Sequence, residues 1–377
     1  MSDLRVCEVV KTLDVGGAEV LLVERLLRAR TDVLRYTVVC MRASTGELTE
    51  RLRAAGVGVV DLSACPRPLV YARLVATVRG LAPHVLNVHS PAPAVVLRLF
   101  VRLAGRMTGW LAGRITGRPA LVVTVHNEHW RRFGGLDRLT RGLDDCTVAV
   151  APLVARSKAT AGCRRVLTRV HGVDVAEQRR WSARADQVRR EFGVPGDAFL
   201  FACVANFRPQ KNHRLLVEAA AEVVRRRPGA LFLLAGDGPL RHEIVREVAA
   251  RGLDGSVRVL GQVPRAGRLV AAADVLVLSS DHEGLPVVVM EALASGVPVV
   301  STRVGGVPDL VVSGHNGILT EPGSVPGLAG AMLRAMEPGP HRDLRAGALA
   351  SAEGLDMAGT AEWFERLYEE LAYGATA

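Results

Sequence analysis

The sequence predicts an α/β protein with two parallel-sheet units. Short apolar runs rich in β-branched residues alternate with longer helical runs through almost all of the 377 residues, and this alternation is typical of parallel strands covered by helices on both faces. A polar, charged stretch at residues 173–190 interrupts the alternation, which restarts after it. The length of the chain, with 49% hydrophobic residues, is large for one core and suits two domains.

The first half contains several runs with the length and composition of buried strands. Helical patterns at 18–29 and 92–111 follow two of these runs. The predicted strands cover residues 5–11, 36–42, 57–62, 85–89, 120–126 and 147–151.

The second half repeats the pattern, and an amphipathic helix is predicted at 360–371. Ligands of open α/β sheets bind beyond the carboxyl ends of the strands, so a cleft between two such units is the expected binding site. The predicted strands of this half cover residues 199–205, 230–235, 257–260, 275–279 and 297–302.

The composition indicates an anionic partner, because the formal net charge is +10 and the pI is near 9.9. A nucleotide, a lipid headgroup and a nucleic acid all fit that charge. Nucleic acid is disfavoured, since aromatic residues make up only 4% of the chain and the arginines are spread along it rather than clustered.

Cellular location and redox state follow from what the chain contains. The six cysteines form no C-x-x-C pair or zinc spacing, which favours reduced, buried thiols over disulfides or metal ligands. The N-terminal stretch carries charges through its apolar residues, unlike a signal peptide, and no uncharged apolar run approaches the roughly 20 residues of a spanning helix. A cytoplasmic protein is expected, with peripheral attachment to the inner face of a membrane as an open alternative.

The segment 92–118 is the candidate for membrane contact. Arg98, Arg102 and Arg106 fall on one helical face beside apolar residues, as in helices that lie on a membrane surface. The alternative interpretation is an ordinary helix packed on the N-terminal sheet.

Two glutamates eight positions apart, Glu283 and Glu291, form the strongest candidate site. Strand 275–279 precedes Glu283, and Pro286 is predicted as the first residue of a helix whose free N–H groups favour an anion. A carboxylate beside such a position can accept two hydrogen bonds from paired hydroxyls, as on a ribose or a hexose. The alternative is that both glutamates are solvated surface residues.

Two cations follow strand 199–205. Arg208 and Lys211 lie in its exit loop, at the same predicted sheet edge as Glu283, where they could neutralise a leaving diphosphate. The chain contains only three lysines, Lys11, Lys158 and Lys211, so a lysine here suggests a need for a compact charge.

Five motifs, in this order along a two-sheet pattern, resemble the signature of the retaining nucleotide-sugar glycosyltransferases of family 4, glycosyltransferase group 1. The glycine pair Gly16-Gly17 resembles the family's loop after the first strand, and His126 its strand-end histidine. The other motifs are the basic segment 207–213, the glycine turn 235–239, and the Glu283–Glu291 stretch; the inter-domain segment 172–174 also matches. One departure is Asn206. Many relatives carry an arginine at this position, five residues before the lysine.

The resemblance implies the GT-B fold, which consists of two facing Rossmann-like domains. Residues 1–180 would bind the acceptor and residues 181–355 the nucleotide sugar, with 356–377 forming a helix that packs back on the first domain. Hinge motion is expected near 173–190.

Site roles also follow from the resemblance. Donor-binding residues would hold the diphosphate, the ribose, the transferred sugar and the base; His126, Glu283, Lys211 and Arg208 would act in catalysis, without a required metal or other cofactor. The donor-binding set is Gly16, Gly17, Asn206, Arg208, Lys211, Gly236, Gly261, Gln262, Val263, Glu283, Gly284, Leu285, Pro286 and Glu291.

The expected activity is transfer of a sugar from a UDP-sugar, or a GDP-sugar, to an acceptor hydroxyl with retention. The acceptor could be a natural product such as an aminocyclitol, a polysaccharide or a lipid-linked intermediate. A nucleotide-sugar epimerase and a non-catalytic sugar-nucleotide-binding subunit remain the alternatives.

Overall fold

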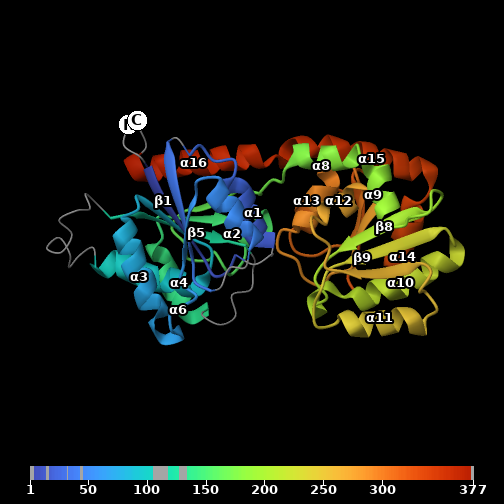
Figure 1. Ribbon diagram of the computed structural model, residues 1–377, viewed down its shortest axis with the longest axis horizontal. Helices are drawn as coiled ribbons and strands as arrows, with labels where there is room; N and C mark the ends of the chain where they lie inside the picture. Colours follow the sequence, from blue (N-terminus) through green and yellow to red (C-terminus); the bar gives the residue numbers. More distant parts are fainter. Residues whose placement is uncertain are drawn as a thin grey trace. The chain divides into compact units, whose positions relative to one another are not determined.

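The computed structural model describes residues 4–13, 17–31, 33–42, 46–104, 118–126 and 134–374. The chain divides into two compact units (Figure 1): a first unit of Met1–Gly172 with Met357–Ala377, and a second unit of Val173–Asp356. The sequence placed this boundary at residue 180. It lies earlier because helix α8, Val175–Ser182, packs against α12 and α13 of the second unit.

The first unit is built on a seven-stranded parallel sheet in the order β3-β2-β1-β4-β5-β6-β7. The order reverses between β1 and β4, so the carboxyl ends of these two strands flank the crevice in which ligands of such sheets bind. The strands are β1 (Leu4–Val10), β2 (Leu34–Cys40), β3 (Gly58–Asp61), β4 (Val85–Val88), β5 (Ala120–Val125), β6 (Cys146–Ala149) and β7 (Val166–Thr168).

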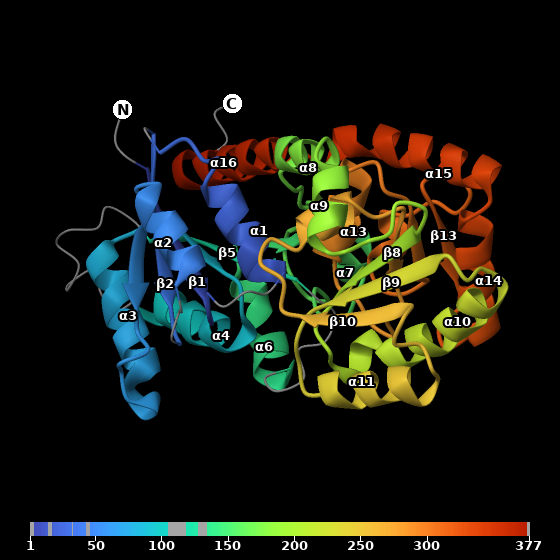
Figure 2. The ribbon, with the colours of Figure 1, turned by 45° about the vertical axis from the view of Figure 1, so that its right-hand side comes forward.

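Helices cover both faces of this sheet, and the C-terminal helix α16 is one of them. It runs beside α1 (Figure 2) and inserts Phe364, Leu367 and Tyr368 into the core around β1 and β2. The helices are α1 (Gly17–Leu26), α2 (Glu47–Ala54), α3 (Val70–Leu81), α4 (Pro91–Leu99), α6 (Gly134–Thr140), α7 (Pro152–Ala155) and α16 (Met357–Tyr373), with 3-10 turns at Arg67–Leu69 and Arg141–Leu143.

The second unit has a six-stranded parallel sheet in the order β10-β9-β8-β11-β12-β13, which reverses between β8 and β11. In Figure 1, α12 and α13 lie on one side of it and α10 and α11 on the other. Its strands are β8 (Phe199–Val204), β9 (Ala230–Ala235), β10 (Val257–Gly261), β11 (Val275–Leu278), β12 (Val299–Thr302) and β13 (Gly317–Thr320).

The helices of the second unit include the segment that the sequence treats as a linker. Residues 173–190 fold into α8 and most of α9 instead of a free connection. The helices are α8, α9 (Ala185–Glu191), α10 (His213–Arg226), α11 (Arg241–Ala250), α12 (Gly267–Ala271), α13 (Val287–Ala294), α14 (Val325–Ala335) and α15 (Pro338–Ser351), with 3-10 turns at Pro209–Lys211, Val307–Asp309 and Ala352–Leu355.

The predicted basic face of 92–118 is wrong for two of its three arginines. Helix α4 ends at Leu99 and continues as a π-helical stretch, Phe100–Ala104. Arg98 is buried and donates to Asp144 (2.7 and 2.8 Å) and to Asp137 (2.6 Å), while Arg102 donates to Asp145 at 2.9 Å and to the Leu143 carbonyl oxygen. These guanidinium groups point into the protein because buried carboxylates require a cation.

The third arginine, Arg106, lies outside the described residues, as does the rest of 105–117. Among the described residues, no helix has both the length and the apolar character needed to cross a membrane.

Candidate functional site

A lysine and a glutamate meet where the strand order of the second unit reverses. Lys211 ends the 3-10 turn after β8, and Glu283 lies in the loop after β11. The Lys211 Nζ lies 2.6 and 2.7 Å from the two carboxylate oxygens of Glu283, and the Ser280 hydroxyl donates to the same carboxylate at 2.6 Å. The side chains are 23% and 6% exposed, so the pair stands at an open edge with most of its surface covered.

Backbone and side-chain hydrogen bonds fasten the two loops to each other. The Asp281 N–H donates to the Gln210 carbonyl oxygen at 2.8 Å, and the Asn212 amide donates to the Asp281 carboxylate at 3.0 Å. Asn212 also caps α10 by accepting from the Leu215 N–H, which its left-handed backbone (φ 44°) permits. The backbone around Lys211 is thus held by Asn212, the N-cap of α10, and by the loop that follows β11.

Glycine in the next loop fixes the backbone around Glu283. Gly305 has φ +54°, and a Cβ there would lie 1.8 Å from the Glu283 carbonyl oxygen. The Gly306 N–H donates to the Gly284 carbonyl oxygen at 2.8 Å. Any side chain at 305 would therefore push the Glu283 loop away.

Helix α13 follows this loop and begins one residue later than predicted. Pro286 occupies the N-cap position with an extended backbone, and Val287 is the first helical residue. Gly284, Leu285 and Pro286 lead directly from Glu283 to the helix start, so the free N–H groups of the first turn lie at the same sheet edge.

Arg208 and Asn206, the other candidates after β8, are exposed. The Arg208 side chain makes no hydrogen bond or ion pair with any residue that the structure describes, so its guanidinium is available at this edge.

The glycine turn after β9 has a packing role of its own. A Cβ at Gly236 would lie 2.1 Å from the Ala205 carbonyl oxygen, and one at Gly238 would lie 2.6 Å from that of Phe207. These glycines let the turn lie directly on the loop that carries Arg208.

The end of β10 lies beside that turn. The Gly236 N–H donates to the Gly261 carbonyl oxygen at 2.8 Å, and Gly261 adopts a left-handed backbone with φ +74°. The next two residues, Gln262 and Val263, are exposed and half-buried respectively. The predicted base-contacting backbone is therefore accessible at the same sheet edge.

The second glutamate, Glu291, is half-buried on α13 and lies beside α12 and α8. A Cβ at Gly267 would lie 3.3 Å from its Oε1 and 2.8 Å from the Gln178 amide nitrogen. The structure therefore groups Glu291 with Gly267 and Gln178, two residues to which the sequence assigned no role.

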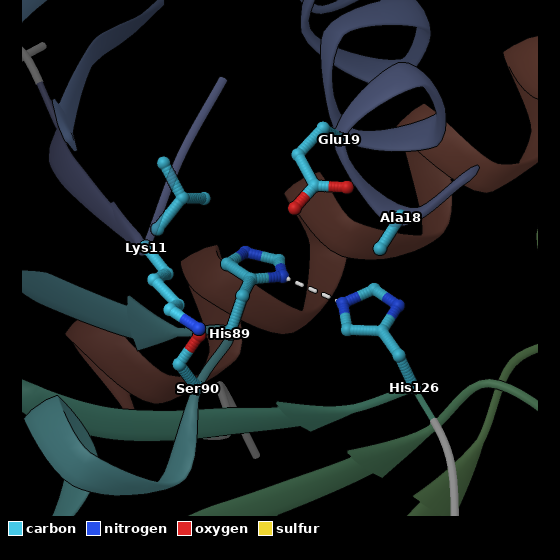
Figure 3. Close-up of a pocket in the computed structure, with 7 residues that line it drawn as sticks. Lys11, Ala18, Glu19, His89, Ser90 and His126 are labelled. Carbon is cyan, nitrogen blue, oxygen red and sulfur yellow. Dashed lines mark hydrogen bonds between the residues drawn. The ribbon is translucent and has the colours of Figure 1, made fainter. Parts of the chain in front are cut away.

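A pocket in the first unit lies where its own strand order reverses (Figure 3). Side chains from the ends of β1, β4 and β5 and from the start of α1 surround it. Gly17 is the first residue of α1, while Gly16 lies outside the described residues. The pocket is lined by Val10, Lys11, Ala18, Glu19, His89, Ser90 and His126.

His126 is connected to a buried carboxylate through a second histidine. Its Nε2 lies 3.0 Å from the Nδ1 of His89, and the Nε2 of His89 lies 2.7 Å from the Glu8 carboxylate. Burial, reinforced by the positive charge of Arg25, lowers the pKa of His126 to about 3. The His126 imidazole is therefore neutral near pH 7.

Glu8 stays ionised because the protein supplies its partners. Burial alone would raise the pKa of Glu8, but the Arg25 charge and the His89 hydrogen bond outweigh it and lower the pKa to about 2. Arg25 lies 2.6 Å from the carboxylate, and the Tyr368 hydroxyl donates to it at 2.8 Å.

Sequence reasoning overlooked Glu8 and His89, yet each left a signal. Glu8 is a charged residue in the apolar part of its strand, Val6–Val10, where an ionised group needs a partner. His89 directly follows its strand, as His126 does, and the two strands are neighbours in the sheet.

Comparison with known proteins finds similarity to one described family. Residues 185–346 match the family described as "Glycosyl transferases group 1". The chain is 32% identical over 250 residues to the N-acetyl-alpha-D-glucosaminyl L-malate synthase of Bacillus anthracis, an alignment that covers 64% of this chain and 65% of that enzyme. The second unit of the chain is thus similar in sequence to the group 1 glycosyl transferases.

Two further likenesses cover more of the chain. It is 28% identical to the 2-deoxystreptamine glucosyltransferase of Streptomyces kanamyceticus, over 68% of this chain and 72% of that protein. The crystal structure of Anabaena HepE in complex with UDP and glucose has a TM-score of 0.82 at 20% identity, covering 97% and 100% of the two chains, which shows the shared GT-B fold.

The segment that matches the group 1 family contains all the candidate donor residues of the second unit, from Asn206 to Glu291. Among the residues that the structure describes, no three His, Cys, Asp or Glu side chains gather as a metal-binding group.

Proposed function

We propose that this protein is a retaining glycosyltransferase that moves a sugar from a nucleotide diphosphate donor, a UDP-sugar in preference to a GDP-sugar, to an acceptor hydroxyl. The observation that carries the proposal is the Lys211–Glu283 pair at the strand reversal of the second unit, held beside a helix start. The match of residues 185–346 to the group 1 glycosyl transferases supports sugar transfer, and retention rests on the family resemblance.

Lys211 suits a leaving diphosphate because an ammonium group has three donors. Two are directed at the Glu283 carboxylate, which leaves one for a phosphate oxygen. Arg208, exposed on the same loop, and the N–H groups at the start of α13 would add positive potential. We propose that these groups stabilise the departing charge without a metal ion.

Glu283 and Glu291 would hold hydroxyls of the donor. Glu283 already accepts from Lys211 and Ser280 and retains lone pairs toward the open edge, which suits the transferred sugar. Glu291 is assigned to the ribose, and Gly236 with Gly261, Gln262 and Val263 to the nucleoside.

The acceptor is assigned to the pocket of the first unit that contains His126. Its polar lining of Lys11, Glu19 and Ser90 suits a hydroxylated molecule. The names of the two enzyme relatives support a small polar acceptor, such as an aminocyclitol, ahead of a polysaccharide or lipid-linked intermediate.

Nucleotide release from a panel of UDP-, GDP-, ADP- and dTDP-sugars tests the proposal, with and without EDTA and with a Lys211→Ala variant. Release from one donor that survives EDTA and disappears in the variant is the expected result. The matched control is Lys158→Ala, which removes a lysine of the first unit that takes no part in the donor site.

Three outcomes would contradict parts of the proposal. Wild-type activity in Lys211→Ala would remove the role of the cation, and loss of activity in EDTA would overturn the metal-free mechanism. Donor binding without turnover in the presence of aminocyclitol and glycan acceptors would indicate a binding subunit, and conversion of the donor sugar without any acceptor an epimerase.

A further inference from the structure

Three side chains form a hydrogen-bonded row that ends at the pocket of the first unit. Glu8 lies on β1, His89 follows β4 and His126 follows β5, and the two imidazole rings are stacked with centroids 5.3 Å apart. Figure 3 shows the bond between the histidines and the second ring nitrogen of His126, which points away from His89.

The direction of the hydrogen bonds follows from the carboxylate at the buried end. An ionised Glu8 can only accept, so the Nε2 of His89 carries a proton. Arg25 already balances the charge of Glu8, so the carboxylate requires no second cation at His89. The Nδ1 of an uncharged His89 then has a lone pair and accepts from the Nε2–H of His126. The remaining nitrogen of His126, Nδ1, is consequently an acceptor.

We propose that Glu8 and His89 are positioning residues that hold His126 in the Nε2–H tautomer, so that its Nδ1 accepts a hydrogen bond from a substrate hydroxyl in the pocket. This inference rests on the proposed function. It adds that the group facing the substrate hydroxyl is a hydrogen-bond acceptor. It selects a hydroxyl donor at this position over a carbonyl or ether oxygen, which can only accept.

Burial makes the acceptor a weak base. Because the pKa of His126 is lowered to about 3, its Nδ1 orients a hydroxyl but does not remove its proton near pH 7. The row therefore acts through geometry and tautomer, in the manner of a histidine whose second nitrogen is fixed by a buried carboxylate.

Glu8 is protected from losing its charge by a second layer of contacts. Arg25 and the Tyr368 hydroxyl both bind its Oε1, and the Asn87 amide donates to the Tyr368 oxygen at 2.8 Å. If the hydrogen bonds of the row ran in the opposite direction, a lone pair of the His89 Nε2 would face the Glu8 carboxylate.

Other titratable groups surround the row. His171 packs 6.0 Å from the His126 ring centroid, and neither of its ring nitrogens has a hydrogen-bond partner among the described residues. Tyr36 lies on β2, while Lys11 and Glu19 line the pocket.

Nitrogen-15 NMR of the histidine-labelled full chain tests the polarity directly. The proton between the two rings should couple to the Nε2 of His126, with a through-bond nitrogen–nitrogen coupling to the Nδ1 of His89. A His126→Gln variant assigns the signals. A proton bonded to the Nδ1 of His89 would overturn the proposal.

Variants separate positioning from packing. His89→Phe keeps a ring but removes both hydrogen bonds, so the protected Nε2–H signal of His126 should vanish and kcat/KM should fall about tenfold. His89→Asn, whose carbonyl oxygen can accept from His126, should restore part of the activity. His171→Phe is the matched control and should keep the wild-type polarity; an equal fall in kcat/KM there would assign the effect to packing and overturn the positioning role.

The Glu8→Gln variant tests the origin of the polarity, because its amide can donate to His89 and permit the reversed row. Both tautomers of His126 are expected; a pure Nε2–H tautomer would show that Glu8 does not set the direction. If this variant does not fold, the wild-type and His89→Phe spectra decide. The spectra need no turnover, so absence of nucleotide release from every donor defeats the proposed function, whereas release with a reversed row defeats this inference alone.

Discussion

Replacing Tyr368 by phenylalanine removes one oxygen atom from the centre of the first unit. The side chain is fully buried on α16, and its hydroxyl donates to Glu8 at 2.8 Å and accepts from the Asn87 amide at 2.8 Å and from Arg25 at 3.3 Å. The ring itself, which packs against Phe364, is retained. The substitution therefore tests polar contacts with little change in volume.

The cost follows from the groups left behind. A hydrogen bond to a charged group contributes about 1.5–3 kcal/mol, and a buried donor left unsatisfied costs about 1–3 kcal/mol. Glu8 keeps Arg25 and His89, so the lower part of these ranges applies, and we expect a loss of about 3 kcal/mol. In a unit of this size, that loss lowers Tm by roughly 6–12 °C.

Calorimetry and hydrogen exchange on the full chain measure this effect. Exchange should accelerate in β1 and β4, which carry Glu8 and Asn87, and remain unchanged in β8 and β9 of the second unit. The control is Tyr373→Phe, a change of the same atom on the exposed end of the same helix. A change in Tm below 2 °C, or equal acceleration in both units, would refute the assignment of the network to the first unit's stability.

Three further predictions concern the donor loop, a buried histidine and the buried arginine. Gly305→Ala should abolish nucleotide release because its Cβ would lie 1.8 Å from a carbonyl oxygen of the donor loop, whereas Gly314→Ala, with a similar positive φ and open space, should retain it; equal activity of the two would contradict the role of the close approach. Burial and the charge of a neighbouring lysine lower the folded-state pKa of His213 to about 4, so the unfolded state gains a proton first as the pH falls from about 6.5, and stability is lost down to pH 4. His213→Phe should reduce the loss between pH 7.5 and 5 by about 2 kcal/mol in urea titrations, and an unchanged pH dependence would refute this linkage. Arg98→Met should destabilise the first unit by about 3–5 kcal/mol because two buried carboxylates lose their cation, while Arg118→Met, at a half-exposed pair, should cost about 0–1 kcal/mol in the same denaturation assay; similar costs would contradict the burial argument.

The sequence predicts most of the fold because buried parallel strands carry a continuous apolar signal. The strands at the centres of both sheets lie within two residues of their predicted bounds. The strands β7 and β13 escaped prediction, and both are short edge strands with mostly half-buried residues. An edge strand has a neighbouring strand on one side only, so its side chains are less covered and need not be apolar.

The candidate site could be proposed from the sequence because charged residues directly after predicted strands are unusual. Lys211, Arg208 and Glu283 have this placement. The contact between Lys211 and Glu283 was not predictable, since it depends on β8 and β11 being neighbours in the sheet. The hydrogen bond between Tyr368 and Glu8 was not predictable for the same reason, because Tyr368 lies on the last helix and Glu8 on the first strand of the chain.

The two units differ in how they stabilise a carboxylate that lies near the strand reversal. Each places a carboxylate at or near the strand reversal of a parallel sheet, where ligands of such sheets bind. Glu8 is enclosed, and Arg25, Tyr368 and His89 take up its hydrogen-bonding capacity, so it is connected to the pocket through His89 and His126. Glu283 is not fully buried, and under the proposed function it binds a donor hydroxyl directly. Replacing Glu8 should therefore first lower the stability of the first unit and change the tautomer of His126. Replacing Glu283 should first lower the affinity for the donor.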